Sequence, residues 1–157
     1  ASVRWTGNSG SGTLNYKSYQ RSYTIAIDGK PDILGSSDPA FRGDRAMHNP
    51  EDLLLSSLAS CHMLWYLHLC ADAGVVVVDY VDSATGVMEE PPNGSGRFTE
   101  VTLNPKVVVA SSDMVESALA LHSLANKMCF IANSVNFPVH HQPIVVVMDG
   151  PCLDDKY

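Results

Sequence analysis

The sequence predicts an α+β protein that folds as a single domain over residues 1–157. Two long helical segments are separated by groups of short strands, and strands and helices do not alternate along the chain, which is the pattern of an α+β fold. Hydrophobic residues make up 45% of the chain and charged residues 17%, so the composition is globular rather than disordered. A length of 157 residues without an internal repeat or a linker suits one ordinary domain.

The N-terminal third of the chain is predicted to form short strands followed by a long loop. Residues 3–6 and 33–34 have the composition of short strands, and residues 14–27 are rich in tyrosine, threonine and isoleucine, which favour strands. Residues 35–50 have the composition of a loop. A loop of this length inside a compact domain is more often functional than idle.

The first long helix is predicted from residue 50 to about residue 72. It starts at an Asn-Pro pair followed by two acidic residues, which suits a helix N-terminus, and Gly74 is a natural stop. Residues 53–71 contain no Asp, Glu, Lys or Arg and approach the length of a membrane span, but their serines and histidines favour a helix buried in a protein core. Because the helix is apolar nearly all round, we expect it at the centre of the fold.

The second half of the chain is predicted to contain four strands, a second long helix and a last strand. The four strands are expected at residues 75–82, 87–90, 98–103 and 106–110. A capping-box pattern over residues 111–116 starts the second helix, which is expected to end near residues 133–136. Residues 143–148 form the last predicted strand, and His140 and His141 are expected in a loop or at a strand edge.

The acidic charge of the chain limits its partners. The 17 Asp and Glu residues outnumber the 10 Lys and Arg residues, which gives a net charge of -7. Duplex nucleic acid and anionic membranes attract basic patches, so neither a nucleic-acid nor a membrane partner is expected. Residues 1–5 lack the basic segment and apolar core of a signal peptide, and we therefore expect a cytoplasmic, reducing location.

The four cysteines, at positions 61, 70, 129 and 152, are too sparse for a disulfide scaffold. Each long helix is predicted to carry one inward-facing cysteine, Cys61 and Cys129. Two buried thiols acting as small hydrophobic side chains and a dithiol pair both fit this pattern. Cys70 lies nine residues after Cys61, about 180° around the helix, so these two cannot share one site. We expect Cys70 and Cys152 to be structural or incidental.

The sequence predicts no metal site. His122 and Cys129 share a helix face but lie about 10.5 Å apart along the predicted axis, too far to bind one ion. His62 and His68 lean to opposite faces of the first helix, and no HxxxH or CxxC pattern occurs. The GxSxG, GxxxxGK[ST] and GxGxxG patterns of hydrolases and nucleotide-binding proteins are also missing from the sequence.

Residues 49–61, Asn-Pro-Glu-Asp-Leu-Leu-Leu-Ser-Ser-Leu-Ala-Ser-Cys, resemble the signature of the OsmC/Ohr family, the osmotically inducible protein C and organic hydroperoxide resistance proteins. That signature joins an Asn-Pro-Glu start to a small and apolar helix with a cysteine ten residues after the glutamate. The resemblance covers most of the chain, since the order of predicted strands and helices also fits. It implies an OsmC-like α+β fold with antiparallel sheets around two central core helices, and an intertwined homodimer.

The resemblance further implies a thiol peroxidase that reduces organic hydroperoxides to alcohols. By carry-over, Cys61 is the peroxidatic cysteine and Cys129, in the second core helix, is the resolving cysteine. No metal or other cofactor is implied, and a dithiol reductant, of the lipoyl type or a small thiol, resets the Cys61–Cys129 disulfide. Two alternatives stay open: a non-catalytic dimer that binds an apolar ligand, and a peroxide-sensing thiol protein.

An arginine and a glutamate complete the site that the resemblance implies. Glu51 is similar to the acid that partners the family's catalytic arginine, for which Arg42 is our choice and Arg45 and Arg21 are the alternatives. A guanidinium beside a sulfur favours the thiolate. On one helix Glu51 and Cys61 would be about 15 Å apart, farther than one arginine easily bridges. Either the start of the helix bends away, or Glu51 and Cys61 of different subunits meet in a two-fold dimer, and the homodimer that the resemblance implies agrees with the second.

Two residues depart from the family pattern, and one of them is also among the four residues expected to line the site. His62 follows the first cysteine where phenylalanine is common, and Phe130 follows the second where proline is common. Apolar walls are expected from Leu58, Trp65, Phe130 and Phe137. Such walls suit an organic peroxide better than hydrogen peroxide.

Overall fold

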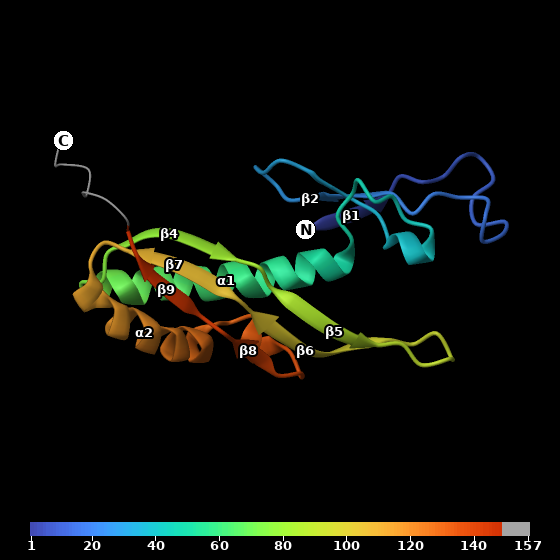
Figure 1. The fold of residues 1–157 in the computed structure, drawn as a ribbon. Helices are drawn as coiled ribbons and strands as arrows, with labels where there is room; N and C mark the ends of the chain where they lie inside the picture. Colours follow the sequence, from blue (N-terminus) through green and yellow to red (C-terminus); the bar gives the residue numbers. More distant parts are fainter. Residues whose placement is uncertain (149–157) are drawn as a thin grey trace. The chain divides into compact units, whose positions relative to one another are not determined.

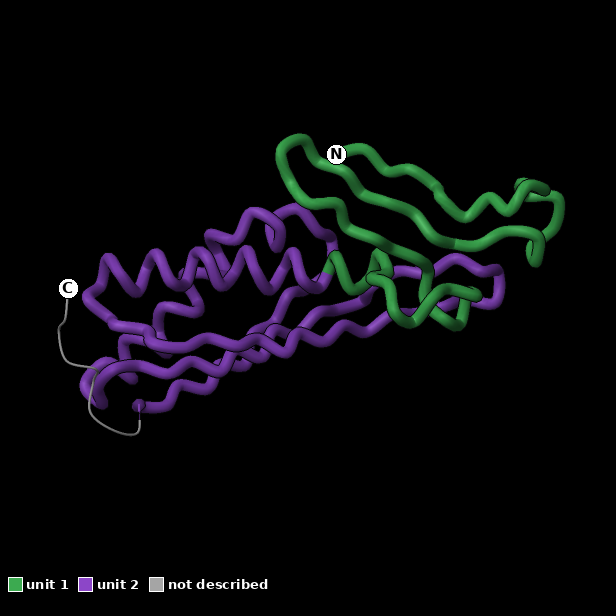
Figure 2. Tube along the Cα trace, turned by 90° about the horizontal axis from the view of Figure 1, so that it is seen from above, with its two compact units in different colours: residues 1–54 green, residues 55–157 purple. Residues whose placement is uncertain are grey.

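The computed structural model describes residues 1–148 of the chain (Figure 1), and these residues fall into two compact units. The first unit is residues 1–54 and the second begins at residue 55, so the boundary falls inside the long helix α1, Pro50–Asp72 (Figure 2). The single domain expected over residues 1–157 stays a prediction. The structural role expected for Cys152 lies outside the described residues.

The first unit contains a three-stranded antiparallel sheet in the order β1-β2-β3. Its strands are β1, Ser2–Trp5, β2, Tyr23–Ala26, and β3, Ile33–Gly35. The strands predicted at residues 3–6 and 33–34 are therefore confirmed. The β-rich stretch 14–27 forms a strand only at its end, because its first residues make turns whose amide groups bond to nearby side chains, as in the bond from the Lys17 amide to Asn15 Oδ1 (2.9 Å).

The loop predicted over residues 35–50 contains one short 3₁₀ turn, η1, Pro39–Phe41. The Asp38 side chain caps this turn by accepting a hydrogen bond from the Ala40 amide at 2.8 Å. Arg42 ends the turn in the left-handed region, with φ of 66°. The loop therefore has a defined backbone rather than an irregular one.

Helix α1 has the bounds that its end signals predict. At its start the Asn49 side chain accepts from the Asp52 amide at 2.7 Å, and at its end Gly74 has φ of 72°, which suits glycine. Its buried residues form a line at four-residue spacing: Leu58, His62, Tyr66 and Cys70. The helix is thus buried along one line, whereas its all-round apolar sequence predicts burial on every face.

The length and hydropathy of α1 are also those of a membrane-spanning helix. The core helix of a soluble protein has the same length and hydropathy, so this property alone is weak evidence for a membrane.

The second unit packs two helices against two three-stranded sheets, in the orders β4-β7-β9 and β5-β6-β8. Its elements after α1 are β4 (Val77–Asp82), β5 (Thr85–Glu89), β6 (Arg97–Leu103), β7 (Pro105–Val109), η2 (Ser112–Met114), α2 (Val115–Met128), η3 (Ala132–Ser134), β8 (Val139–His141) and β9 (Ile144–Val147). All five predicted strands of this half are confirmed. The core joins α1, α2 and β7 through the buried residues Tyr66, Cys70, Val107, Val109, Ala118 and Ala125.

The two sheets of the second unit are mixed, so the expectation of antiparallel sheets is corrected. β4 and β5 pair antiparallel with β7 and β6, but β9 runs parallel to β7 and β8 parallel to β6. The parallel pairs arise because the chain crosses over through α2 before it returns to the sheets. β8 also makes His140 and His141 part of a strand, beside β6.

Helix α2 differs from its prediction at both ends. No side chain caps it, because the 3₁₀ turn η2 leads directly into its first turn and takes the place of the predicted capping box. The helix ends at Met128 rather than near residues 133–136, and Cys129 follows it with extended backbone. Cys129 is therefore fixed at the end of α2, not within it.

Candidate active site

The structure brings Cys61 and Cys129 together as free thiols. Cys61 is on α1 and partly exposed, whereas Cys129 closes α2 and is 1% exposed. The two side chains are hydrogen-bond neighbours. The sequence pattern fits either a dithiol pair or two separate buried thiols. The packing of the two helices in the second unit brings the thiols together as a pair.

The two thiols differ in their surroundings. Burial is the main cause that raises the pKa of Cys129 to about 11, and its hydrogen bond to Cys61 adds to the shift. The Ala132 amide donates to Cys129 Sγ at 3.4 Å, and this hydrogen bond lowers the pKa of Cys129 and so partly offsets the increase. Cys129 is therefore a protonated thiol at neutral pH, beside the thiol of Cys61.

Aromatic side chains flank the dithiol. Trp65 lies one helical turn after Cys61, and Phe130 directly follows Cys129. Their rings meet edge to face, with centroids 5.8 Å apart at 82°. Phe130 is 68% exposed, so it forms an outer wall, whereas Leu58 is fully buried. The fourth expected wall residue, Phe137, packs on Phe98 at 5.7 Å.

The glutamate and the arginines of the expected site lie in the first unit. Glu51 is partly buried in the first turn of α1, where its charge adds to the effect of burial in raising the pKa of Tyr23. Among residues 1–148 it makes no ion pair, so the structure does not join it to Arg42, Arg45 or Arg21. The roles of these four residues stay predictions.

A buried histidine pair is a feature that the sequence reasoning missed. His62 Nε2 lies 3.0 Å from His122 Nδ1, both side chains are fully buried, and the Tyr66 ring stacks on His122 with centroids 3.9 Å apart. His141 on β8 lies beside them, 5.8 Å from His62 between ring centroids. The four-residue spacing from His62 to Tyr66 is the sequence signal that places these two residues on one face of α1.

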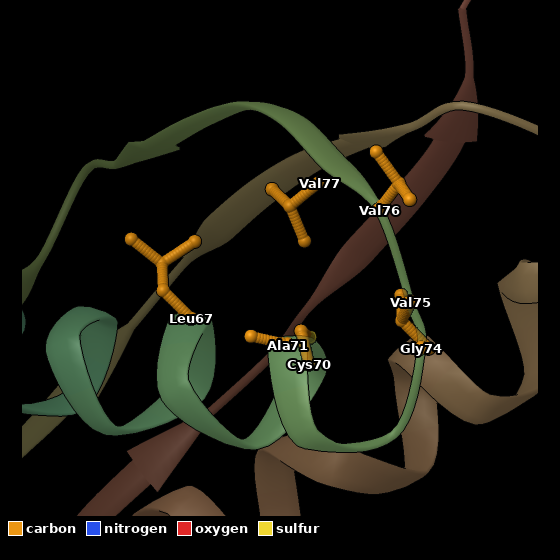
Figure 3. A pocket seen from close by; sticks show the side chains of 7 residues that line it. All are labelled: Leu67, Cys70, Ala71, Gly74, Val75, Val76 and Val77. Atoms are coloured by element: carbon orange, nitrogen blue, oxygen red, sulfur yellow. The ribbon is translucent and has the colours of Figure 1, made fainter.

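The remaining described cysteine, Cys70, has the properties of a structural residue, as predicted. It is buried, its pKa is raised mainly by burial, and it neighbours the Tyr66 hydroxyl. It lines an apolar pocket of about 310 Å³ between the end of α1 and the start of β4, where Leu67 and Val77 lie on opposite sides (Figure 3). Within residues 1–148, no group of three or more His, Cys, Asp or Glu side chains is placed to hold a metal ion.

Comparison with known proteins adds to this geometry. The family model described as OsmC-like protein matches residues 43–143. An OsmC-like protein of unknown function from Vibrio cholerae is 32% identical, with a TM-score of 0.82 over 91% of this chain and 96% of that one. No curated protein matches the sequence.

More distant structures share the fold. An organic hydroperoxide resistance protein from Elizabethkingia anophelis, solved with thiocyanate bound, is 17% identical with a TM-score of 0.64, and the match covers 94% of this chain and 97% of that one. An OsmC-like protein from Mycoplasma pneumoniae is 20% identical with a TM-score of 0.66, over 85% and 92% of the two chains. With a family match over residues 43–143 and the Vibrio cholerae relative over nearly its whole length, the chain belongs to the OsmC-like family.

Proposed function

We propose that this protein is a cysteine-based thiol peroxidase that reduces organic hydroperoxides to alcohols. The observation that supports the proposal best is the contact between a partly exposed thiol, Cys61, and a buried protonated thiol, Cys129. Proteins of the same fold bear the name organic hydroperoxide resistance protein, which agrees with this activity.

The reaction begins at the more accessible sulfur. The Cys61 thiolate attacks the terminal oxygen of the hydroperoxide, the O–O bond breaks, and the alkoxide leaves as the alcohol after it takes up a proton. Cys61 is thereby oxidised to the sulfenic acid. Solvent access favours Cys61 as the attacking group, since Cys61 is partly exposed and Cys129 is buried.

The second sulfur completes the cycle. Cys129 gives up its proton, its sulfur attacks the sulfenic sulfur, and water leaves as the Cys61–Cys129 disulfide forms. A dithiol reductant, of the lipoyl type or a small thiol, then returns both cysteines to thiols by exchange and is itself oxidised to a disulfide. No further co-reactant is needed.

Glu51 and an arginine belong to the same proposal. Arg42 is the first choice for the cation that favours the thiolate, with Arg45 and Arg21 as alternatives, and Glu51 is its positioning residue. On the uninterrupted helix α1 Glu51 and Cys61 are about 15 Å apart, so a homodimer in which they meet across subunits is part of the proposal. A cytoplasmic location is proposed because a reducing compartment keeps the pair reduced between cycles.

The test is mass spectrometry of the intact protein after one equivalent of cumene hydroperoxide. We expect loss of two hydrogens and a Cys61–Cys129 linked peptide in the non-reduced digest. Cys61→Ser should consume no peroxide, Cys129→Ser should stop at an oxidised Cys61, and Cys70→Ser is the matched control that should behave as the parent protein. Normal peroxide turnover by Cys61→Ser would reject the proposal.

A non-catalytic protein that binds an apolar ligand is the second candidate. The pocket shown in Figure 3 supports it, because it is lined by valine, leucine, alanine, glycine and one buried cysteine. Under this alternative the thiols persist after peroxide treatment. The same mass measurement therefore separates the two functions.

A further inference from the structure

The first unit contains a pocket around which three of the chain's five arginines gather. Arg21, Arg42 and Arg45 line this pocket, whose volume is about 420 Å³. Its other lining residues are Gln20, Ser22, Ser36, Gly43, Asp44 and Met47. All of them belong to the first unit, on the segment before β2 and on the loop around η1.

The positive charge of this pocket is unpaired. Among residues 1–148, none of the three arginines forms an ion pair with a carboxylate. The carboxylate that lines the pocket, Asp44, is engaged locally, since its Oδ1 accepts from the Ala46 amide at 2.9 Å. Three arginines and one aspartate thus line the pocket in a chain whose net charge is -7, and such a concave cluster attracts anions.

Arg21 is held rigidly at the pocket. Its guanidinium carbon lies 4.2 Å from the ring centroids of both Tyr16 and Tyr19. Two of its nitrogens donate to the carbonyl oxygens of Tyr19 and Tyr16, at 2.6 Å and 2.7 Å. A guanidinium has five N–H donors, and two of those of Arg21 are used by these carbonyl oxygens, so the group is already fixed in place.

The loop that carries the other two arginines is tightly folded. Among the described residues Arg42 is the non-glycine residue with positive φ, a strained conformation that is found most often at functional sites. The next residue must be glycine, because a Cβ on Gly43 would lie 1.4 Å from the Ser37 carbonyl oxygen. This backbone fixes where the Arg42 and Arg45 side chains begin.

A buried hydroxyl adds a neutral donor to the pocket. Ser36 is 2% exposed, and its Oγ accepts from the Asp44 amide at 3.1 Å. Its hydroxyl hydrogen has no acceptor among residues 1–148 and is free to donate to a ligand. The lining is therefore rich in donors and poor in free acceptors.

We propose that this pocket binds the oxyanion end, a carboxylate or a phosphate, of a small organic molecule. Planar guanidinium forks bind both oxyanions with paired hydrogen bonds. The volume is in the range of small-molecule sites and exceeds what a bare ion fills, and Met47 offers an apolar contact to a carbon skeleton. The inference adds a ligand to the arginines from which the proposed peroxidase activity draws its cation, and it needs no reaction at Cys61.

The test is isothermal titration of the reduced full-length chain with hexanoate, with inorganic phosphate and with methyl hexanoate. We expect saturable binding of at least one anion, weaker binding at higher salt, and no binding of the uncharged ester. Binding of hexanoate alone identifies a carboxylic acid as the ligand class, and binding of phosphate alone identifies a phosphate ester.

Matched variants assign the binding to the pocket. Arg42→Gln/Arg45→Gln should weaken anion binding by at least about tenfold, because two charge-assisted hydrogen bonds are lost. Arg4→Gln, on the exposed strand β1, should bind as the parent does. Arg42→Lys/Arg45→Lys keeps both charges and should bind, but more weakly than the parent. It is the control for a loss of binding that is caused by misfolding of the glutamine variant. Unchanged affinity in the glutamine variant, equal binding of the ester, or no binding of either anion would overturn the proposal.

Discussion

His62 and His122 meet edge to edge in the core of the second unit, with Nε2 of His62 3.0 Å from Nδ1 of His122. Their planes differ by only 6° and their centroids are 5.3 Å apart, so the rings are joined through the nitrogens rather than face to face. One nitrogen must donate and the other accept, and the lowered pKa values of both rings keep the pair neutral at pH 7. Burial is the main cause that lowers the pKa of His62 to about 4 and that of His122 to about 3.

The first prediction is that the protein loses stability in mild acid. Both pKa values are lower in the folded chain than the ordinary value of 6.5, so below pH 6.5 the unfolded chain binds more protons than the folded one. Stability should be full above pH 6.5 and fall as the pH drops toward 4. The expected loss is about 3 kcal/mol from His62 alone, measured by urea unfolding at a series of pH values.

Two variants isolate the pair from other acid effects. His62→Phe/His122→Phe should flatten the pH dependence above pH 5, because neither buried imidazole is left to be protonated. His68→Gln is the matched control, since His68 is exposed beside Asp72, and it should keep the dependence of the parent. A parent protein whose stability is constant between pH 6.5 and 5 contradicts the prediction.

The second prediction concerns Tyr66, which connects the histidine pair to the core. Its ring is fully buried, stacks on His122 and lies among core residues of α2 and β7. Tyr66→Ala should destabilise the protein by about 3–5 kcal/mol through the cavity that it leaves. Leu14→Ala, at a residue that is 80% exposed, should change the free energy of unfolding by less than about 0.5 kcal/mol. Equal urea midpoints for the two variants would rule out this role.

The third prediction is an order of reactivity among the cysteines. At pH 7 iodoacetamide should modify Cys61 at least about tenfold faster than Cys129, because the thiolate is the nucleophile and Cys129 is protonated and buried. Modification of Cys129 should accelerate as the pH rises toward 11. Cys70, also buried with a raised pKa, is the internal reference for an inert thiol. Peptide mass spectrometry over time measures the rates, and slow, equal labelling of all three would favour the non-catalytic alternative.

The sequence predictions are most accurate where the residues that determine a structural feature lie close to it in the sequence. Helix α1 is predicted to its end residues because its Asn cap, its acidic first turn and Gly74 act within a few residues of the helix. The end of α2 has no such signal, and the chain leaves the helix at Cys129 where the thiol becomes buried against the rest of the second unit. Strand β8 is missed for the same reason, since it exists only through its pairing with β6.

Some features of the candidate site can be predicted from the sequence, and others depend on tertiary packing. The Asn-Pro-Glu motif and its spacing to Cys61 point to Cys129 through a family resemblance, and packing of α1 with α2 then brings the thiols together. The edge-to-edge contact of His62 and His122 joins residues 60 positions apart, and no sequence pattern links them. The gathering of three arginines around one pocket likewise depends on how the loop after β3 folds back toward the segment before β2.

The fourth prediction decides which arginine serves the peroxidase activity. Under the proposed function, Arg42→Gln should lower kcat/KM for cumene hydroperoxide by about 10²-fold, which is the usual loss when one charged donor at a reacting centre is removed. Arg45→Gln and Arg21→Gln are the matched comparisons, because both line the same pocket as Arg42. Whichever variant shows the large loss identifies the arginine, and full activity in Arg42→Gln would remove it from the mechanism.

Glu51 is expected to act through that arginine rather than on the peroxide. Glu51→Gln should therefore lower kcat/KM and also shift the pH dependence of Cys61 alkylation, a change that a purely structural residue would not cause. The double variant with Arg42→Gln should lose little more than either single variant, since the two residues work as one unit. Glu51→Asp should restore part of the activity by returning the charge. Additive losses in the double variant would show that Glu51 and Arg42 act independently, and the pairing of these two residues would then be wrong.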